Sequence, residues 1–345
     1  MGTYSFLDDY SEGCHQSILD LMQQSNMSQQ AAYGNDEYSD NARKLIQVHL
    51  GDTASEVFFV AGGTLANLII ASSALRSHEA IITANSGHIV RHETGAIEAV
   101  GHKVISVPSD DGKLTVAGID AAIGEHSLFP HMVQARIVYI SNATERGTVY
   151  TKSELTDIST ACKERNLMLW MDGARLGAAL TSNKSDLTLQ DCALLTDVFW
   201  IGGTKAGALI GEAIVISNPR LREDFQCFIK QRGALLAKGR LLGIQFSALF
   251  ADDRFFDLTR FSNQMAQKLS AAIVQCGYEI TAETESNQIF PALPNDLITV
   301  LQENFGFYVW QQRDNGTAVV RLVTSWATDE QQVDRFIAIL QNHGV

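Results

Sequence analysis

The stretch Arg136-Ile137-Val138-Tyr139-Ile140-Ser141 decides how this chain folds. It is a short run rich in apolar and β-branched residues, which predicts a buried β-strand. A helical pattern follows from Ser153 to Arg165, and Leu167-Met168-Leu169-Trp170-Met171 then predicts a second buried strand. Two strands joined through a helix are typical of parallel pairing within one sheet.

The same alternation of short apolar runs and helical patterns extends from about Glu56 to Ser217. A helix is predicted from Thr64 to Leu75, and another helical segment begins near His92. Further strands are predicted at Val57–Val60, Ala80–Thr83, Lys103–Val107, Val198–Ile201 and Ala208–Ser217, the last returning directly from the one before it. This pattern indicates an α/β fold with a mostly parallel seven-stranded sheet covered on both faces. Ligands of such sheets gather in the loops at the C-terminal ends of the strands.

The pattern changes after about Leu242. Later elements are predicted to be a long helix, two strands and a closing helix, at Phe255–Cys276, Gln288–Phe290, Ala318–Val323 and Asp329–Asn342. We therefore expect a large domain at 16–242 and a small α+β domain at 243–345. The N-terminal segment 1–15 is expected to pack near the small domain.

Composition excludes several classes of protein. The chain has 345 residues, a net charge of −13 and no basic cluster, which makes nucleic acid and anionic membrane poor partners. No apolar run reaches the roughly 20 residues of a membrane span, and the start of the chain does not resemble a signal peptide. The five cysteines are scattered without a CxxC pair, so we expect neither disulfides nor a metal site, and a cytoplasmic location is the simplest.

Lys205 lies in the apolar, glycine-rich turn Trp200-Ile201-Gly202-Gly203-Thr204-Lys205. Desolvation there would lower the pKa of its amine and make it nucleophilic toward an aldehyde. The alternative is a lysine in a tight surface turn. Asp172, at the end of a predicted strand some thirty residues earlier, suits a carboxylate that pairs with a protonated pyridine nitrogen, or else one that caps the next helix.

Three further features favour a bound phosphate and a carboxylate substrate. Gly63 and Thr64 lie between a strand and a helix, where backbone amides bind phosphate, and the Thr204 hydroxyl is a possible addition. The motif is neither GxGxxG nor a P-loop, which argues against NAD and ATP. His88 either stacks on a cofactor ring or is structural. Arg175 and Arg321 either clamp a substrate carboxylate or form ordinary ion pairs.

The chain resembles the low-specificity L-threonine aldolases of the β-eliminating lyase group, which are fold-type I enzymes dependent on pyridoxal 5'-phosphate (PLP). The resemblance is carried by Tyr33-Gly34-Asn35-Asp36, Gly62-Gly63-Thr64-Leu65-Ala66-Asn67, His88, Asp172-Gly173-Ala174-Arg175, Thr204-Lys205, Gln231–Gly239 and Arg321. It implies that Lys205 holds PLP as a Schiff base, that Asp172 binds the pyridine nitrogen, and that Gly63 and Thr64 bind the phosphate. It also implies that His88 stacks on the ring and that Arg175 and Arg321 bind the substrate carboxylate.

The resemblance implies further roles outside these motifs. His131 falls where the family has a histidine near the substrate hydroxyl. Tyr33 falls in a loop that family members place near a neighbouring subunit's site, and Lys238 would reach a cofactor phosphate across the same interface. The resemblance therefore implies a homodimer or homotetramer with shared active sites. The family's usual N-terminal Arg-Ser-Asp-Thr is Leu7-Asp8-Asp9-Tyr10 here, so either Ser11 replaces the carboxylate-binding serine or substrate binding differs.

The expected reaction is retro-aldol cleavage of L-threonine, L-allo-threonine or a related β-hydroxy-α-amino acid to glycine and an aldehyde. His88 or His131 is the expected base, because histidine titrates near neutral pH. The alternatives are β-elimination or transamination on the same fold, and a binding protein without catalytic activity.

Overall fold

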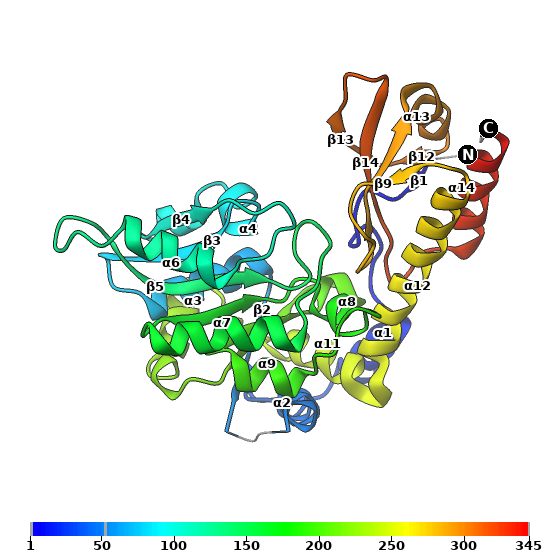
Figure 1. Cartoon of the computed structure of the whole chain (residues 1–345). Helices are drawn as coiled ribbons and strands as arrows, with labels where there is room; N and C mark the ends of the chain where they lie inside the picture. Colours follow the sequence, from blue (N-terminus) through cyan, green and yellow to red (C-terminus); the bar gives the residue numbers. More distant parts are fainter. Residues whose placement is uncertain (1–2, 52–53, 344–345) are drawn as a thin grey trace.

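The computed structural model describes residues 3–51 and 54–343. Figure 1 shows a large domain built on one sheet and a smaller domain beside it, with the long helix α12 (Arg254–Gln275) running from one to the other. The large sheet has seven strands in the order β2-β8-β7-β6-β5-β3-β4. Their bounds, in that order, are Glu56–Val60, Glu212–Ile216, Val198–Gly202, Met168–Asp172, Gln134–Ser141, Glu79–Ala84 and Lys103–Val107. β8 is antiparallel to both neighbours and every other pairing is parallel, which confirms the predicted fold class.

Both faces of this sheet are covered, and the central strand shows how. In β5, Val138 and Ile140 belong to one hydrophobic core, while Ile137 and Tyr139 belong to the core on the opposite face. One face is covered by helices at Gln16–Ser25 (α1), Glu37–Leu50 (α2), Val116–Glu125 (α6), Lys152–Glu164 (α7), Leu176–Leu180 (α8), Leu189–Leu195 (α9) and Arg240–Phe250 (α11). The other face is covered by Gly63–Ala74 (α3), His88–Arg91 (α4), Ala96–Ala99 (α5) and Phe225–Gln231 (α10). Successive side chains of a strand point to opposite faces, so a strand buried on both faces must be apolar throughout.

Local chemistry explains where several elements differ from their predicted bounds. α7 begins at Lys152, one residue before the predicted start, because Thr151 and Glu154 form a capping box. The helix predicted near His92 is instead two short helices, α4 and α5, separated where Thr94 and Gly95 both adopt positive φ angles of 53° and 72°.

The small domain has its own core. Its strands lie at Glu279–Ile280 (β9), Gln288–Ile289 (β10), Pro291–Pro294 (β11), Tyr308–Gln312 (β13) and Thr317–Val323 (β14). The sheet packs against α12, α13 (Asn295–Gln302) and α14 (Glu330–His343) through β10, β11 and β14, while all five residues of β13 are exposed. Within the described part of the chain, no helix combines the length and apolar character that crossing a membrane requires.

The predicted division between the domains lies between residues 242 and 243. The core of the large domain includes Phe246, Phe250 and Phe255, all beyond residue 242. Met265 and Leu269, further along α12, belong to the core of the small domain. We therefore propose that the division lies within α12.

The N-terminal segment joins the two domains. β1 (Tyr4–Ser5) pairs in parallel with β12 (Phe305–Gly306) of the small domain, and Phe6 is fully buried in that core. Asp9 then reaches the large domain. Its carboxylate accepts hydrogen bonds from Arg175 Nε at 2.7 Å and Nη2 at 3.0 Å, and from Asn287 Nδ2 at 2.9 Å.

We predict that Asp9→Asn lowers the free energy of unfolding by about 3 kcal/mol, because it leaves the Arg175 guanidinium without its buried counter-charge. Burial raises the pKa of Asp9, but Arg175 and Lys205 outweigh this, so the net shift is downward. The stabilisation is therefore complete above about pH 4 and is lost as the pH falls through the lowered pKa. Urea unfolding of both proteins at pH 7 and at progressively lower pH measures the effect.

The control is Asp257→Asn, which removes an exposed carboxylate paired with Arg260 and is expected to leave the urea midpoint unchanged. Equal stability of the Asp9→Asn variant and the original protein at pH 7 would contradict the prediction.

Candidate active site

Two adjoining cavities lie at the C-terminal ends of the parallel strands. The inner pocket, of about 280 Å³, is lined by Tyr10, Ala61, Gly62, Gly63, Thr64, Asn67, His88, Glu93, Asp172, Ala174, Trp200, Thr204, Lys205, Ile210 and Glu212. The outer pocket, of about 400 Å³, is lined by Asp8, Tyr10, His88, His92, Glu145, Arg175, Lys205, Gln288, Tyr308, Trp310 and Arg321. Tyr10, His88 and Lys205 line both, so the two cavities share a wall.

The loops after β6 and β7 cross in direct backbone contact, which sets the position of Asp172 relative to Lys205. A Cβ atom at Gly173 would lie 1.8 Å from the carbonyl oxygen of Trp200, and one at Gly202 would lie 2.4 Å from that of Ala174. Only glycine allows so close an approach of two backbones. The glycines in these two motifs are therefore required by the geometry of the site.

Asp172 ends β6 with a carboxylate that is only 3% exposed. Its Oδ2 accepts hydrogen bonds from the Tyr139 hydroxyl at 2.5 Å and from Asn67 Nδ2 at 3.3 Å, and its Oδ1 accepts one from the Ala174 amide at 2.9 Å. Burial and the charge of Asp172 raise the pKa of Tyr139, which keeps that phenol a donor. In the described part of the chain, no basic side chain forms an ion pair with this buried carboxylate.

Lys205 lies in the 3₁₀ turn Thr204–Ala206 after β7. Its amine lies 5.8 Å from the centre of the Tyr10 ring and forms no hydrogen bond with another described residue. Burial, and then the charge of Arg175, lower the pKa of the amine. A lysine that lines two cavities in this way is not one in a solvated surface turn, so that alternative is wrong.

His88 is oriented by a buried carboxylate. Oε1 of Glu93 lies 3.0 Å from His88 Nδ1 and accepts a hydrogen bond from Asn67 Nδ2 at 2.8 Å. Burial alone lowers the pKa of His88, but the hydrogen bond to Glu93 and the charge of Asp172 outweigh it, so the pKa is raised. With Nδ1 engaged, His88 Nε2 forms no hydrogen bond with the described protein and can exchange a proton with a bound molecule.

The first turn of α3 forms one end of the inner pocket. Gly62 precedes the helix without a side-chain cap, so the amides of residues 63–65 have no hydrogen-bond acceptor in the described protein. A Cβ atom at Gly63 would lie 2.8 Å from the Trp200 ring, which explains the glycine. Unpaired amides at a helix N-terminus attract a phosphate.

Thr204 lines the inner pocket next to Lys205. Its hydroxyl donates to Glu212 Oε1 at 3.1 Å and accepts from the Gly211 amide at 3.2 Å, so its proton is already used. Burial raises the pKa of Glu212 to about 7, which reduces its negative charge beside an anion site. We infer that Thr204 positions Glu212 and does not donate to a phosphate.

The two predicted carboxylate-binding arginines both line the outer pocket, and each also has a partner of its own. Arg175 holds Asp9, as described above. Arg321 Nη2 donates to the Leu7 carbonyl at 3.0 Å and lies 3.6 Å from Asp8 Oδ1. Its guanidinium also lies about 5 Å from the aromatic rings of Tyr308 (5.1 Å) and Trp310 (5.3 Å).

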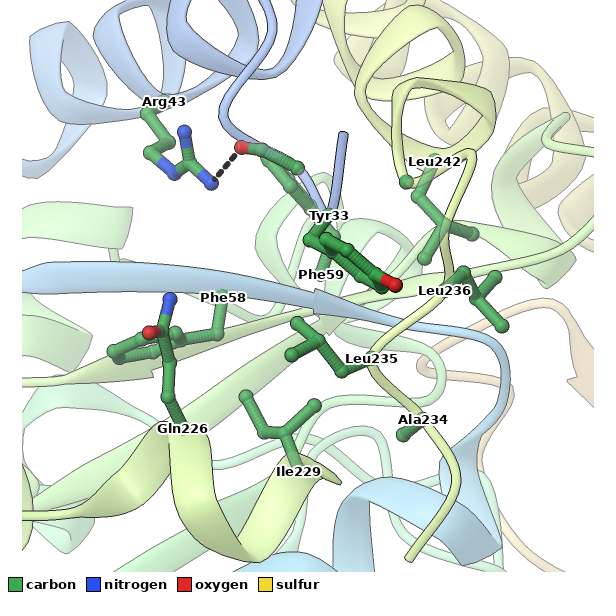
Figure 2. A pocket seen from close by; sticks show the side chains of 12 residues that line it. Tyr33, Arg43, Phe58, Phe59, Gln226, Ile229, Ala234, Leu235, Leu236 and Leu242 are labelled. Atoms are coloured by element: carbon green, nitrogen blue, oxygen red, sulfur yellow. Dashed lines mark hydrogen bonds between the residues drawn. The ribbon is translucent and has the colours of Figure 1, made fainter. Parts of the chain in front are cut away.

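Four predicted residues lie outside both pockets of their own chain. His131 is exposed and precedes β5, an eight-residue strand, so it lies roughly 25 Å from the strand's C-terminal end. Ser11 is exposed, just beyond Tyr10. Figure 2 shows Tyr33 in a separate hollow beside the edge strand β2. The backbone amide of Tyr33 donates a hydrogen bond to the carbonyl of Ala237, and Lys238 is the next residue after Ala237.

Sequence reasoning did not select several polar residues that complete the site. Asn67, Glu93 and Glu212 line the inner pocket, Glu145 lines the outer pocket, and Tyr139 donates to Asp172. Two of them carried a usable signal, because Asn67 interrupts an apolar helix and Glu212 opens an otherwise apolar strand. Tyr139 carried none, since an aromatic residue is ordinary in a buried strand.

Comparisons with known proteins agree with this geometry. The sequence model of the beta-eliminating lyase family matches residues 7–294. The chain belongs to this family. A curated relative, the low specificity L-threonine aldolase of Pseudomonas sp. (strain NCIMB 10558), is 34% identical over 343 residues, covering 96% of this chain and 95% of the relative.

Solved structures extend the comparison beyond the family. The threonine aldolase of Leishmania major superimposes with a TM-score of 0.97 at 50% identity, over 99% of this chain and 100% of that one. The aspartate aminotransferase of Thermus thermophilus shares only the fold, with a TM-score of 0.72 at 11% identity over 99% and 91% of the two chains. This family member therefore has a fold that also occurs in aminotransferases, and its own pocket must identify its reaction.

We predict that Glu93→Gln lowers the pKa of His88, because it removes the charge and weakens the hydrogen bond that raise it. An NMR titration of the histidine ring nitrogens is expected to show His88 titrating at a lower pH than in the unmodified protein.

Glu98→Gln is the matched control, since Glu98 is an exposed carboxylate in the neighbouring helix α5. An unchanged His88 titration in the Glu93→Gln variant would show that Glu93 does not set the charge state of this ring.

Proposed function

We propose that this chain cleaves L-threonine, L-allo-threonine and related β-hydroxy-α-amino acids to glycine and an aldehyde, with PLP anchored covalently on Lys205. The proposal depends on one arrangement of residues. Lys205 and Asp172 line the same cavity, and this cavity adjoins a second one that is lined by two arginines. The chain is similar to two threonine aldolases, which supports the same activity.

The residues of the inner pocket fit PLP. The buried Asp172 carboxylate has no cationic partner in the described chain, which suits a protonated ring nitrogen. The Lys205 amine has a lowered pKa and no hydrogen bond, which suits attack on an aldehyde. The amides at Gly63 and Thr64 suit the phosphate, and His88 lies at a wall of the cavity where a ring can stack on it.

When bound, PLP supplies an electron-withdrawing ring that accepts the electron pair of the breaking Cα–Cβ bond. Asp172 would keep the ring nitrogen protonated. Its own charge is held in place by Tyr139 and Asn67, whose donors both point at Oδ2. This arrangement costs little reorganisation during the reaction, because the donors are already oriented.

His88 is the proposed base for the substrate's β-hydroxyl. Its Nδ1 is held by Glu93, which leaves Nε2 to accept the hydroxyl proton as the aldehyde carbonyl forms. His131 lies outside the pockets of its own chain, so a role for it requires another subunit.

Arg175 and Arg321 are the proposed binders of the substrate's α-carboxylate. Arg321 can pair with this carboxylate through two parallel hydrogen bonds, which also orients the amino acid. Arg175 would contribute through Nη1, because its Nε and Nη2 hold Asp9. Arg321 has an Nε that is buried without a partner in the described chain, so it has hydrogen-bonding capacity to offer.

The proposal is tested by incubating the protein and PLP with L-threonine. We predict acetaldehyde and glycine in equal amounts, and a visible absorption band of bound PLP that Lys205→Ala abolishes together with several orders of magnitude of activity. Lys184→Ala, which removes an exposed lysine paired with Glu283 away from the pockets, is expected to keep the absorption band. Formation of a keto acid without acetaldehyde would instead establish the alternative, β-elimination or transamination.

We predict that Arg321→Gln raises the KM for L-threonine at least about tenfold with a smaller change in kcat, because a charge-assisted hydrogen bond is lost. Asp8→Asn is expected to lower the KM by roughly threefold to tenfold, because it removes a carboxylate that competes for the same guanidinium.

Steady-state kinetics with L-threonine measures both changes, and Glu12→Gln is the matched control for an exposed carboxylate nearby. A higher KM in Asp8→Asn would show that Asp8 helps to bind the substrate instead of competing with it.

We also propose a homodimer or homotetramer with shared active sites, in the cytoplasm. His131, Tyr33 and Lys238, which the family resemblance associates with a site, all lie outside the pockets of their own chain. The loop that carries His131 also exposes Leu128 and Phe129, with 62% and 74% of their surfaces accessible. Apolar side chains so exposed are typical of an interface between subunits. The five cysteines are all free, which suits a reducing compartment.

A further inference from the structure

A third cavity continues from the outer pocket on the side away from Asp172. This distal hollow, of about 300 Å³, is lined by Ser86, Arg91, His92, Glu145, Arg146 and Trp310. Three of these residues, His92, Glu145 and Trp310, also line the outer pocket. A molecule held in the outer pocket by its α-carboxylate therefore has a cavity into which its far end can extend.

The distal hollow carries positive charge. The side chain of Arg146 forms no hydrogen bond or ion pair with any described residue. Arg91 uses Nε to donate to the Asn85 carbonyl at 2.8 Å, which leaves its two terminal nitrogens available. Two guanidinium groups at one cavity, neither with a counter-ion among the described residues, favour an anion.

Glu145 is the one carboxyl group among the residues that line the distal hollow, and it offsets little of this charge. Burial raises its pKa. Its Oε1 already accepts hydrogen bonds from the His88 amide at 2.9 Å and the Ser141 hydroxyl at 2.7 Å. It is therefore committed to holding the His88 loop and pairs with neither arginine of the hollow.

A buried hydroxyl adds an independent sign of a ligand. Ser86 is 6% exposed, lines the distal hollow, and its Oγ has no hydrogen-bond partner in the described structure. A buried polar group without a partner is costly, and such groups are usually satisfied by a ligand or by water. A carboxylate oxygen is an acceptor that this hydroxyl and the arginines can share.

We infer that the distal hollow is a subsite for a carboxylate carried on the β-substituent of the substrate. This inference rests on the proposed function, because it assumes that the amino acid lies in the outer pocket. It adds acidic β-hydroxy-α-amino acids, such as 3-hydroxyaspartate and 3-hydroxyglutamate, to the substrates of the enzyme. The methyl group of threonine has no charge for Arg91 or Arg146 to recognise.

The chemistry of the cleavage is the same for these substrates. The Cα–Cβ bond breaks, the β-hydroxyl loses its proton and becomes a carbonyl, and Cα takes up a proton to give glycine. The second product is glyoxylate from 3-hydroxyaspartate, or the three-carbon oxo acid, malonate semialdehyde, from 3-hydroxyglutamate. The reaction consumes no oxidant or reductant.

The test compares kcat/KM for L-threonine and for the L-isomers of both acidic substrates in the holoenzyme. We expect Arg146→Gln to lower kcat/KM for at least one acidic substrate about tenfold, while that for threonine changes less than about twofold. Arg91→Gln is expected to act in the same direction. The matched control is Arg220→Gln, which removes an exposed arginine near the N-terminal ends of the parallel strands, at the other end of the sheet from the distal hollow.

A second measurement does not depend on turnover. Calorimetric titration with L-aspartate, L-glutamate and L-alanine is expected to show Arg146→Gln weakening the binding of an acidic amino acid about tenfold and leaving that of alanine unchanged. Equal losses for all three ligands, or no loss for the acidic ones, would overturn the subsite. Failure to release acetaldehyde from threonine would overturn the proposed function instead, and the calorimetric result would still decide the subsite.

Discussion

The structure around the site depends on one constraint, which is the burial of the Asp172 carboxylate without a cationic partner in the described chain. A buried charge is stable only when its hydrogen-bonding capacity is filled. Tyr139 and Asn67 supply side-chain donors from two different elements, and Ala174 supplies an amide. These donors, the glycine contacts between the loops after β6 and β7, and the packing of Trp200 against α3 are mutually dependent. Together they form the floor of the inner pocket.

Two carboxylates of the N-terminal segment lie between this floor and the outer pocket. Asp9 neutralises Arg175 and is fully buried, so it connects the large domain to the segment that pairs with the small domain. Asp8, the next residue back, stands near Arg321 in the outer pocket. The same short segment therefore stabilises the arrangement of the domains and adjusts the charge that an incoming carboxylate meets.

Much of the fold could be predicted, and so could the places of Lys205 and Asp172 in the inner pocket, because both depend on local patterns. The strand at Arg136–Ser141 is apolar on both faces, and Lys205 and Asp172 stand at predictable places after strands. The roles of Thr204 and Glu93 could not be predicted in this way. Thr204 is adjacent to the lysine but donates to Glu212, and Glu93 orients His88 only because the chain reverses between α4 and α5.

The sequence by itself determined the parallel α/β architecture and the places of Lys205 and Asp172 after their strands, because strand periodicity and the glycine motifs are properties of contiguous residues. Only the tertiary structure decided that Asp9 forms an ion pair with Arg175 and that His131 lies outside the pockets of its own chain. It also decided that Arg91 and Arg146 line one cavity. Each of these depends on residues brought together from separate elements. Pairings of that kind follow from the packing of the folded chain and leave no periodic signal along it.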